Sequence, residues 1–145
     1  MARLVTSLPV LLVAAHVLAN VVWIGALLSV ATLTSRAPFV ADPSEVGALA
    51  RRVYWRLAVP GFLASFAAGA ARISLAPQMY AHLPWFHAKL GLALVVIVLH
   101  HIIGGRARRV ANGKAEAGAG IGTLAAVTFL CVAGVVLLGV AKSLR

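Results

Sequence analysis

Four long apolar stretches dominate this sequence and limit it to few folds. They cover about residues 8–34, 53–75, 85–103 and 121–140 of a chain of 145 residues. Each is close to the roughly 20 residues with which a helix crosses the core of a bilayer. Apolar residues make up 62% of the chain, whereas soluble domains contain roughly 45–50%. We therefore predict an all-α fold, a single integral membrane four-helix bundle over residues 1–145.

The connections between these stretches carry recognisable helix signals. Asp42, Pro43 and Glu45 form a typical helix start, which predicts a short interfacial helix between the first two spans. Pro60 lies inside the second span and predicts a kink there. Gly104 and Gly105 predict the end of the third helix.

Basic residues give the predicted topology. The connections between spans 1 and 2 and between spans 3 and 4 hold eight of them, and the opposite side holds four. The eight are Arg36, Arg51, Arg52, Arg56, Arg106, Arg108, Arg109 and Lys114, and the four are Arg3, Arg72, Lys142 and Arg145. The positive-inside rule then predicts both termini outside and the two basic loops in the cytoplasm. The membrane that we expect is a bacterial cytoplasmic (inner) membrane.

The net charge of +10 raises the alternative of a nucleic-acid partner. The basic residues flank apolar spans, however, and form no stripe with interleaved aromatics, so we predict the lipid bilayer as the partner and no nucleic acid. A single cysteine, Cys131, excludes an internal disulfide and a thiolate cluster.

A few polar residues fall inside the spans, where a lysine near the centre costs at least ~2.5 kcal/mol. In the first span His16, Asn20 and Trp23 are four and three residues apart, so they share a helix face. Lys89 in the third span lies at about the depth of His16, and the two are expected to be able to face one another. His100 lies about 16 Å further along the third helix.

Simpler interpretations stand beside a functional one. His16 can hydrogen-bond a neighbouring helix, Lys89 can extend its ammonium to the headgroups, and His87 lies near the interface. His100 and its neighbour His101 precede an arginine cluster, so contact with lipid is as good an explanation as ligation. Neutral imidazole is also a usual axial ligand of haem iron in helical bundles.

A particular set of residues resembles a known family. The third span reads Trp-Phe-His-Ala-Lys-Leu-Gly over 85–91, followed by His100 and by Gly-Arg-x-Arg-Arg over 105–109. The set also includes residues of the first two spans, namely His16, Trp23, Gly25, Tyr54, Arg56, Pro60 and Gly69. Over about residues 12–109 the chain resembles the HemJ-type protoporphyrinogen IX oxidases and the wider CopD-like superfamily.

The resemblance implies a b-type haem and an oxidoreductase activity. Members of this family oxidise protoporphyrinogen IX, a tetrapyrrole, and pass the electrons to quinone or to the respiratory chain. His16 then corresponds to the ligand of the haem iron, and His16 and Lys89 to the catalytic pair. The resemblance also implies a cofactor site lined by His87, Asn20, Trp23 and His100.

Other functions remain open. The last span lacks the Asn-Glu-x-Pro motif of the family, which fits a non-catalytic haem-binding, electron-transfer or packing subunit of a membrane complex. A copper-related membrane protein ranks below these, because Met1, Met79 and Cys131 are the soft copper ligands of the chain. The many glycines and alanines favour close helix packing, so we expect a homo-oligomer.

Overall fold

The computed structural model describes residues 8–143, and the side chains of residues 8–140. Arg3 and Arg145, which entered the topology count, lie outside the described residues, as does the side chain of Lys142. No strand occurs in the described part. In chain order the elements are α1 (Leu8–Arg36), the 3-10 turn η1 (Ala37–Phe39), α2 (Pro43–Val53), the π-helical turn η2 (Tyr54–Ala58), α3 (Val59–Ser74), α4 (Pro77–Ala81), α5 (Pro84–Ala111), the 3-10 turn η3 (Ala115–Gly118) and α6 (Ile121–Ser143).

The described residues contain four helical segments long and apolar enough to cross a membrane. They cover Leu8–Phe39, Pro43–Ser74, Pro84–Ala111 and Ala115–Val140. Their outer surface carries large apolar side chains, among them Leu18 and Leu137, each 67% exposed. Such a surface suits hydrocarbon and not water. The fold is that of a multi-pass membrane protein, which confirms the all-α prediction.

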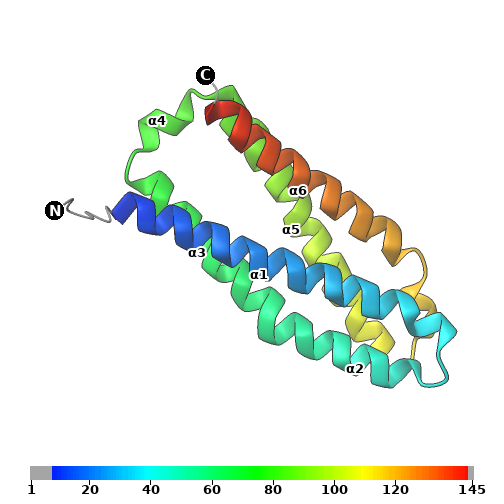
Figure 1. Ribbon diagram of the computed structural model, residues 1–145. Helices are drawn as coiled ribbons and strands as arrows, with labels where there is room; N and C mark the ends of the chain where they lie inside the picture. The colour runs from blue at the N-terminus through cyan, green and yellow to red at the C-terminus, as the bar shows by residue number, and fades with distance from the viewer. Residues whose placement is uncertain (1–7, 144–145) are drawn as a thin grey trace.

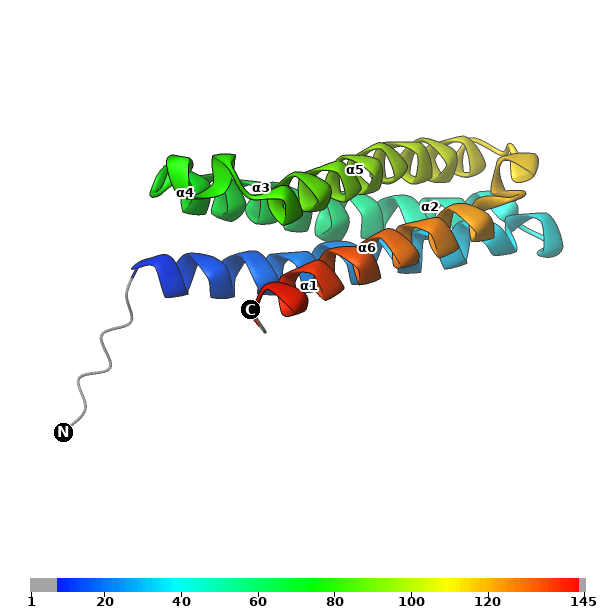
Figure 2. The same cartoon turned by 90° about the horizontal axis from the view of Figure 1, so that it is seen from above.

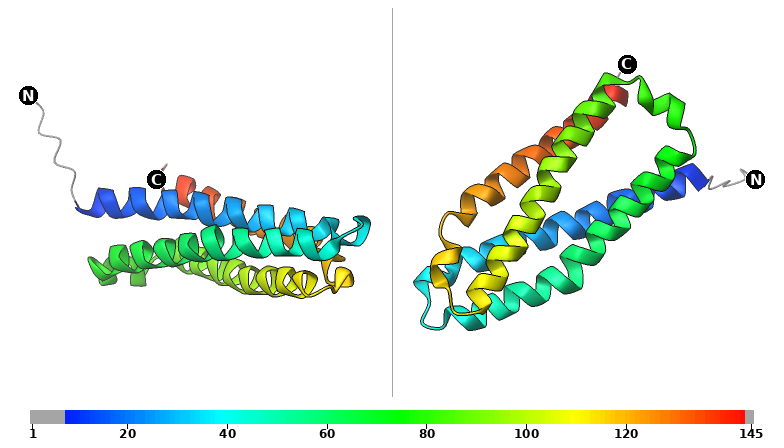
Figure 3. Two further views of the ribbon diagram at one scale, coloured as in Figure 1. Left: turned by 90° about the horizontal axis from the view of Figure 1, so that it is seen from below. Right: turned by 180° about the vertical axis from the view of Figure 1, so that it is seen from behind.

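The helices form two layers, α1 with α6 and the long α2–η2–α3 rod with α5 (Figure 2). α1 packs along α3, and α5 packs along α6. The two pairs meet at one end and diverge toward the other (Figures 1 and 3). We call the meeting end, which contains residues 31–58 and 104–121, the basic end. The opposite end, with residues 8–20, 66–92 and 132–143, is the divergent end.

Two predicted helix boundaries differ from the structure. The segment expected as a separate interfacial helix is α2, and it continues through η2 into α3 as one long rod (Figure 1). The third helix does not end at Gly104 and Gly105 but runs to Ala111. Gly104 is buried, and a Cβ there would collide with the ring of Tyr54, so the missing side chain serves packing instead of termination. The short helix α4, which the sequence had not indicated, bridges the two pairs at the divergent end (Figure 1).

The π-helical turn has an identifiable cause. The N–H of Val59 bonds to the carbonyl of Tyr54, five residues back, directly before Pro60. Pro60 has no N–H to donate, and its ring crowds the preceding turn, so an ordinary helix is disturbed at this point. The wider turn is the local response at the predicted kink, and such turns often occur at functional sites.

The packed core lies toward the basic end. The buried residues of α1 begin at Trp23, and those of α5 begin at Val96. Leu27, Val30 and Ile103 are completely buried and belong to one cluster that joins α1, α2, α5 and α6. Polar side chains toward the basic end therefore lie in a packed core, and those toward the divergent end lie outside it.

Candidate functional site

His100 of α5 is the largest of the fully buried polar side chains in the described chain, and it is 1% exposed. Its Nδ1 lies 3.1 Å from Nε1 of Trp23, on α1. Its Nε2 lies 3.1 Å from the hydroxyl of Tyr54, in η2. Three of the four long segments thus meet at one imidazole, which we call the His100 cluster.

The two hydrogen bonds fix the form of this imidazole. An indole N–H can only donate, so Nδ1 of His100 accepts and carries no proton. In the neutral ring Nε2 then carries the proton and donates it to the oxygen of Tyr54. Both ring nitrogens are used within the protein, which leaves His100 no free atom for a metal ion.

Aromatic rings and glycines enclose the cluster. Phe62 of α3 lies 5.2 Å from the ring centre of His100 and 5.1 Å from that of Trp23. The ring of Tyr54 occupies the space beside Gly104, and Gly61 lies against the backbone of Trp23, with 2.8 Å from the position of a Cβ to the Trp23 nitrogen. The expected alternative that His100 contacts lipid is therefore wrong.

His16 of α1 has a different environment, nearer the divergent end. Its Nδ1 lies 2.8 Å from the carbonyl oxygen of Ser65, on α3, and 3.4 Å from the Ser65 hydroxyl. A carbonyl only accepts, so Nδ1 carries the proton and Nε2 keeps its lone pair. The ring rests on Gly69, 3.1 Å from the position of a Cβ there. The prediction that His16 bonds a neighbouring helix is confirmed, and a nitrogen suited to ligation is left over.

Arg72 adds a cationic group on the same face of α3, since it is three residues beyond Gly69 and seven beyond Ser65. Its guanidinium carbon lies 5.7 Å from the ring centre of Tyr80, on α4. Its Nε is buried and has no hydrogen-bond partner in the described part of the chain. A buried donor of this kind is costly unless an acceptor reaches it.

The other predicted site residues are dispersed. Asn20 donates to the carbonyl of His16 on its own helix, and Trp23 belongs to the His100 cluster. His87 is exposed, with Nδ1 3.0 Å from the carbonyl of Leu83. Lys89 is half-buried on α5, whose first turns lie apart from the first half of α1 (Figure 1). The expectation that His16 and Lys89 face one another stays a prediction.

Sequence reasoning gave no site role to Tyr54, Phe62 or Ser65. A usable signal existed for the first of these, because Tyr54 and His100 both lie toward the basic ends of their spans and so share a depth. No signal identified Ser65, since its contribution to His16 is mainly a backbone carbonyl.

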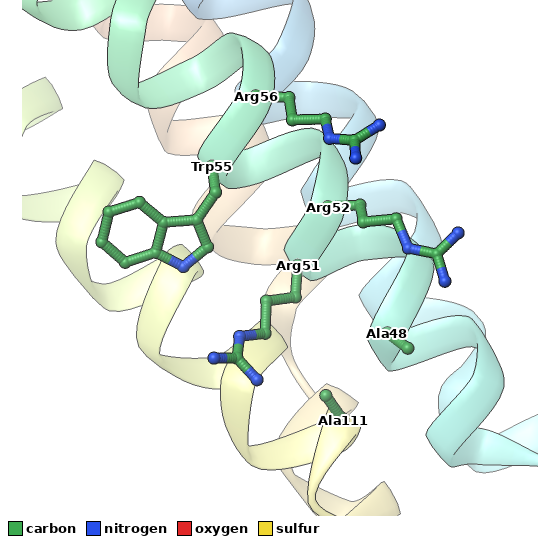
Figure 4. Close-up of a pocket in the computed structure, with 6 residues that line it drawn as sticks. All are labelled: Ala48, Arg51, Arg52, Trp55, Arg56 and Ala111. Atoms are coloured by element: carbon green, nitrogen blue, oxygen red, sulfur yellow. The ribbon is translucent and has the colours of Figure 1, made fainter.

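A third polar feature is a surface pocket on α2 and η2 that is lined by three arginines and Trp55 (Figure 4). It lies at the basic end, away from His16, and its Trp55 ring lies 5.7 Å from the ring of Tyr54 in the His100 cluster.

In the part of the chain that the structure describes, no three His, Cys, Asp or Glu side chains come together as a metal-binding group. This bears on centres built from several protein ligands, whereas a haem needs one or two. Comparison of the chain with protein-family models, with curated proteins and with solved structures finds no match.

Proposed function

We propose that this protein is a b-type haem protein of the bacterial cytoplasmic membrane, with His16 as an axial ligand of the iron. The observation that carries the proposal is the hydrogen bond from Nδ1 of His16 to the carbonyl of Ser65. Ligating histidines usually donate their second ring N–H to a carbonyl or carboxylate, which fixes the tautomer and the ring orientation. Among the histidines inside the bundle, His16 has this arrangement and His100 does not.

The surroundings of His16 suit a flat, dianionic macrocycle. Gly69 leaves one side of the imidazole without a side chain, and the two helix pairs diverge at this end (Figure 1). Haem also carries two propionate groups, for which the unpartnered Nε of Arg72 is a suitable donor. The missing side chain at Gly69, the divergence of the helix pairs and the unpartnered Arg72 Nε would each lower the stability of a bundle without a ligand. A bound haem would offset that loss of stability.

A second axial position, if filled by this chain, falls to α5. His87 and Lys89 lie near the start of this helix, and Nδ1 of His87 is anchored to the Leu83 carbonyl in the same way as that of His16. The resemblance in sequence favours Lys89 for this position or for a propionate. The His100 cluster would then act as the fixed support of α1, holding Trp23 two turns away from His16.

A bound haem supplies a one-electron carrier inside the membrane. The resemblance extends the proposal to an oxidoreductase that takes electrons from a porphyrinogen and passes them to quinone or to the respiratory chain. In this proposal the chain positions the haem through His16, pairs its carboxylates through Arg72 and excludes water with its apolar helices. The predicted orientation, with both termini outside, puts this site in the outer half of the membrane.

The test is absorption spectroscopy on protein expressed with a haem precursor and purified in mild detergent. We expect a reduced b-type band at near one haem per chain, lost in His16→Ala and retained in the control His82→Ala, whose side chain is exposed at the end of α4. Arg72→Gln should lower the haem content while leaving the position of the band unchanged.

The remaining outcomes separate the alternatives. Wild-type protein without haem would contradict the proposal, and a band that survives His16→Ala but not His87→Ala would move the ligand to α5. Haem together with oxidation of protoporphyrinogen IX supports an enzyme. Haem without turnover supports an electron-transfer or packing subunit.

A further inference from the structure

Three arginines and a tryptophan line an open pocket of about 340 Å³ at the basic end (Figure 4). The lining residues are Ala48, Arg51, Arg52, Trp55, Arg56 and Ala111. Arg51 extends toward the end of α5, and Arg52 and Arg56 extend together on the other side of the rod (Figure 4). Ala48 and Ala111 contribute small side chains to this pocket, beside the point where Gly47 lets α2 and α5 approach closely.

The three guanidinium groups lack protein anions. The whole chain has three acidic residues against thirteen basic ones. Asp42 is occupied as the cap of α2, where it accepts from the N–H groups of Ser44 and Glu45. Within the described residues no ion pair or hydrogen bond involves the Arg51, Arg52 or Arg56 side chains. Glu45 lines a neighbouring pocket with Arg52 but makes no ion pair with it in the described part of the chain, so the three adjacent cations favour an external anion.

Apolar groups accompany these charges. Trp55 is 60% exposed, Leu57 is 49% exposed and Leu49 is 48% exposed, all on the same helical rod. A free anion would use only the guanidinium groups, whereas a phospholipid presents a phosphate and acyl chains together. Arginine binds phosphate oxygens in a bidentate manner, and tryptophan prefers the depth of the headgroups.

The depth of the pocket also matches a headgroup. The arginines lie between the capped start of α2 and the apolar run of α3, so they stand where the rod enters the hydrocarbon. Basic pockets between membrane helices are known sites for anionic lipid headgroups.

We propose that this pocket, formed by Arg51, Arg52 and Arg56 with Trp55 and Ala111, is a specific site for an anionic phospholipid. The guanidinium groups bind the phosphate from the two sides of the pocket, and the indole and Leu49, which lines a neighbouring pocket with Arg52, contact the upper part of the acyl chains. This site is independent of haem binding and lies at the opposite end of the bundle.

The experiment measures lipid retention by the full chain in phosphatidylcholine nanodiscs with and without dioleoylphosphatidylglycerol. Native mass spectrometry after detergent extraction counts the bound phosphatidylglycerol. The test variant is Arg51→Gln, Arg52→Gln, Arg56→Gln. The matched control is Arg36→Gln, Arg108→Gln, Arg109→Gln, which removes the same charge from exposed positions at the same end but outside the pocket.

We expect wild type and the control variant to retain one phosphatidylglycerol, and the pocket variant to bind it at least about tenfold more weakly. Equal losses in the two variants would overturn the pocket and leave only the general attraction of a basic surface. Equal retention of phosphatidylcholine would overturn the specificity for an anionic lipid.

Two further measurements test the ligand class and the apolar half of the site. Displacement of the lipid by millimolar inorganic phosphate would overturn the lipid and indicate a soluble phosphate-bearing ligand; failure to displace it supports the proposal. Trp55→Ala keeps every charge, so it tests the apolar half of the site if the triple variant does not fold. We expect a several-fold weaker retention of phosphatidylglycerol, and unchanged retention would overturn a role for the indole.

Discussion

The basic end and the divergent end of this bundle differ in how closely the helix backbones approach one another. At the basic end backbones nearly touch, since a Cβ on Gly47 would collide with the backbone of Ala111 and one on Gly118 with the carbonyl of Thr34. At the divergent end Gly91 and Gly139 have nothing within 4 Å of the position of a Cβ. The same residue type serves close backbone packing at Gly47 and Gly118 and only helix surface at Gly91 and Gly139.

This difference indicates where stability and where binding reside. Toward the basic end one cluster of buried residues joins the four long segments, so changes there should be costly. The divergent end leaves a histidine nitrogen and an arginine N–H without partners in the described chain, so changes there should affect ligands more than folding.

The largest effect should come from a matched pair of glycines. Gly47→Ala should lower the free energy of unfolding by about 3 kcal/mol, because the new methyl group meets the backbone of α5. Gly91→Ala should be neutral or stabilising by up to about 1 kcal/mol, since alanine is the better helix former. Denaturant unfolding in detergent measures both, and similar values for the pair would refute the contrast between the ends.

A second pair compares the two histidines. His100→Phe keeps an aromatic ring but leaves the indole N–H of Trp23 buried without an acceptor, at a cost of about 2 kcal/mol. His16→Phe loses one bond at a half-buried position and should cost less than about 1 kcal/mol. If His16 proved the more costly of the two in haem-free protein, its role would be structural.

The hydroxyl of Tyr54 gives a smaller test. Tyr54→Phe removes the acceptor of the His100 Nε2–H and should destabilise the protein by about 1 kcal/mol. Tyr80→Phe is the control, because Tyr80 is also buried but contributes its ring face to Arg72 and no hydroxyl bond in the described part. Thermal unfolding of the two variants should separate them, and equal shifts would argue against a stabilising hydrogen bond between Tyr54 and His100.

The smallest effect concerns pH at the start of α2. The Ser44 hydroxyl and the Glu45 N–H lower the pKa of the Asp42 carboxyl from its ordinary value of 3.8. A lowered folded-state pKa means that the cap stabilises above the unfolded-state value and is lost as the pH falls through the folded-state value. Wild type should therefore lose stability relative to Asp42→Asn below about pH 4, and parallel pH profiles would contradict this.

The sequence was sufficient for the four spans because the bilayer sets both their length and their composition. Lateral arrangement was harder. Depth alone placed His16 and Lys89 at one level, whereas α1 packs most extensively along α3, and no periodicity encodes that choice. The same comparison of depth in the membrane would have predicted a contact between Tyr54 and His100, and these two side chains do form a hydrogen bond.

Helix ends were predictable only where a cap was present. Asp42 begins α2 as expected, because its carboxylate satisfies free N–H groups there. Gly104 and Gly105 did not end α5. A helix continues through glycine when packing contacts compensate for the low helix propensity of glycine, and here the ring of Tyr54 packs in the space beside Gly104. Such compensation depends on a residue 50 positions away and is invisible locally.

The π-helical turn at Tyr54–Ala58 acts as a phase shifter between the halves of a 32-residue rod. A turn closed over five residues holds one residue more than an α-turn, and one residue corresponds to 100° of rotation. Deleting a single residue from this turn would restore an α-helix and swing the arginine pocket around the rod relative to Ser65 and Gly69. The one additional residue of the π-helical turn therefore sets the angle around the rod between the face proposed to bind lipid and the face proposed to bind haem.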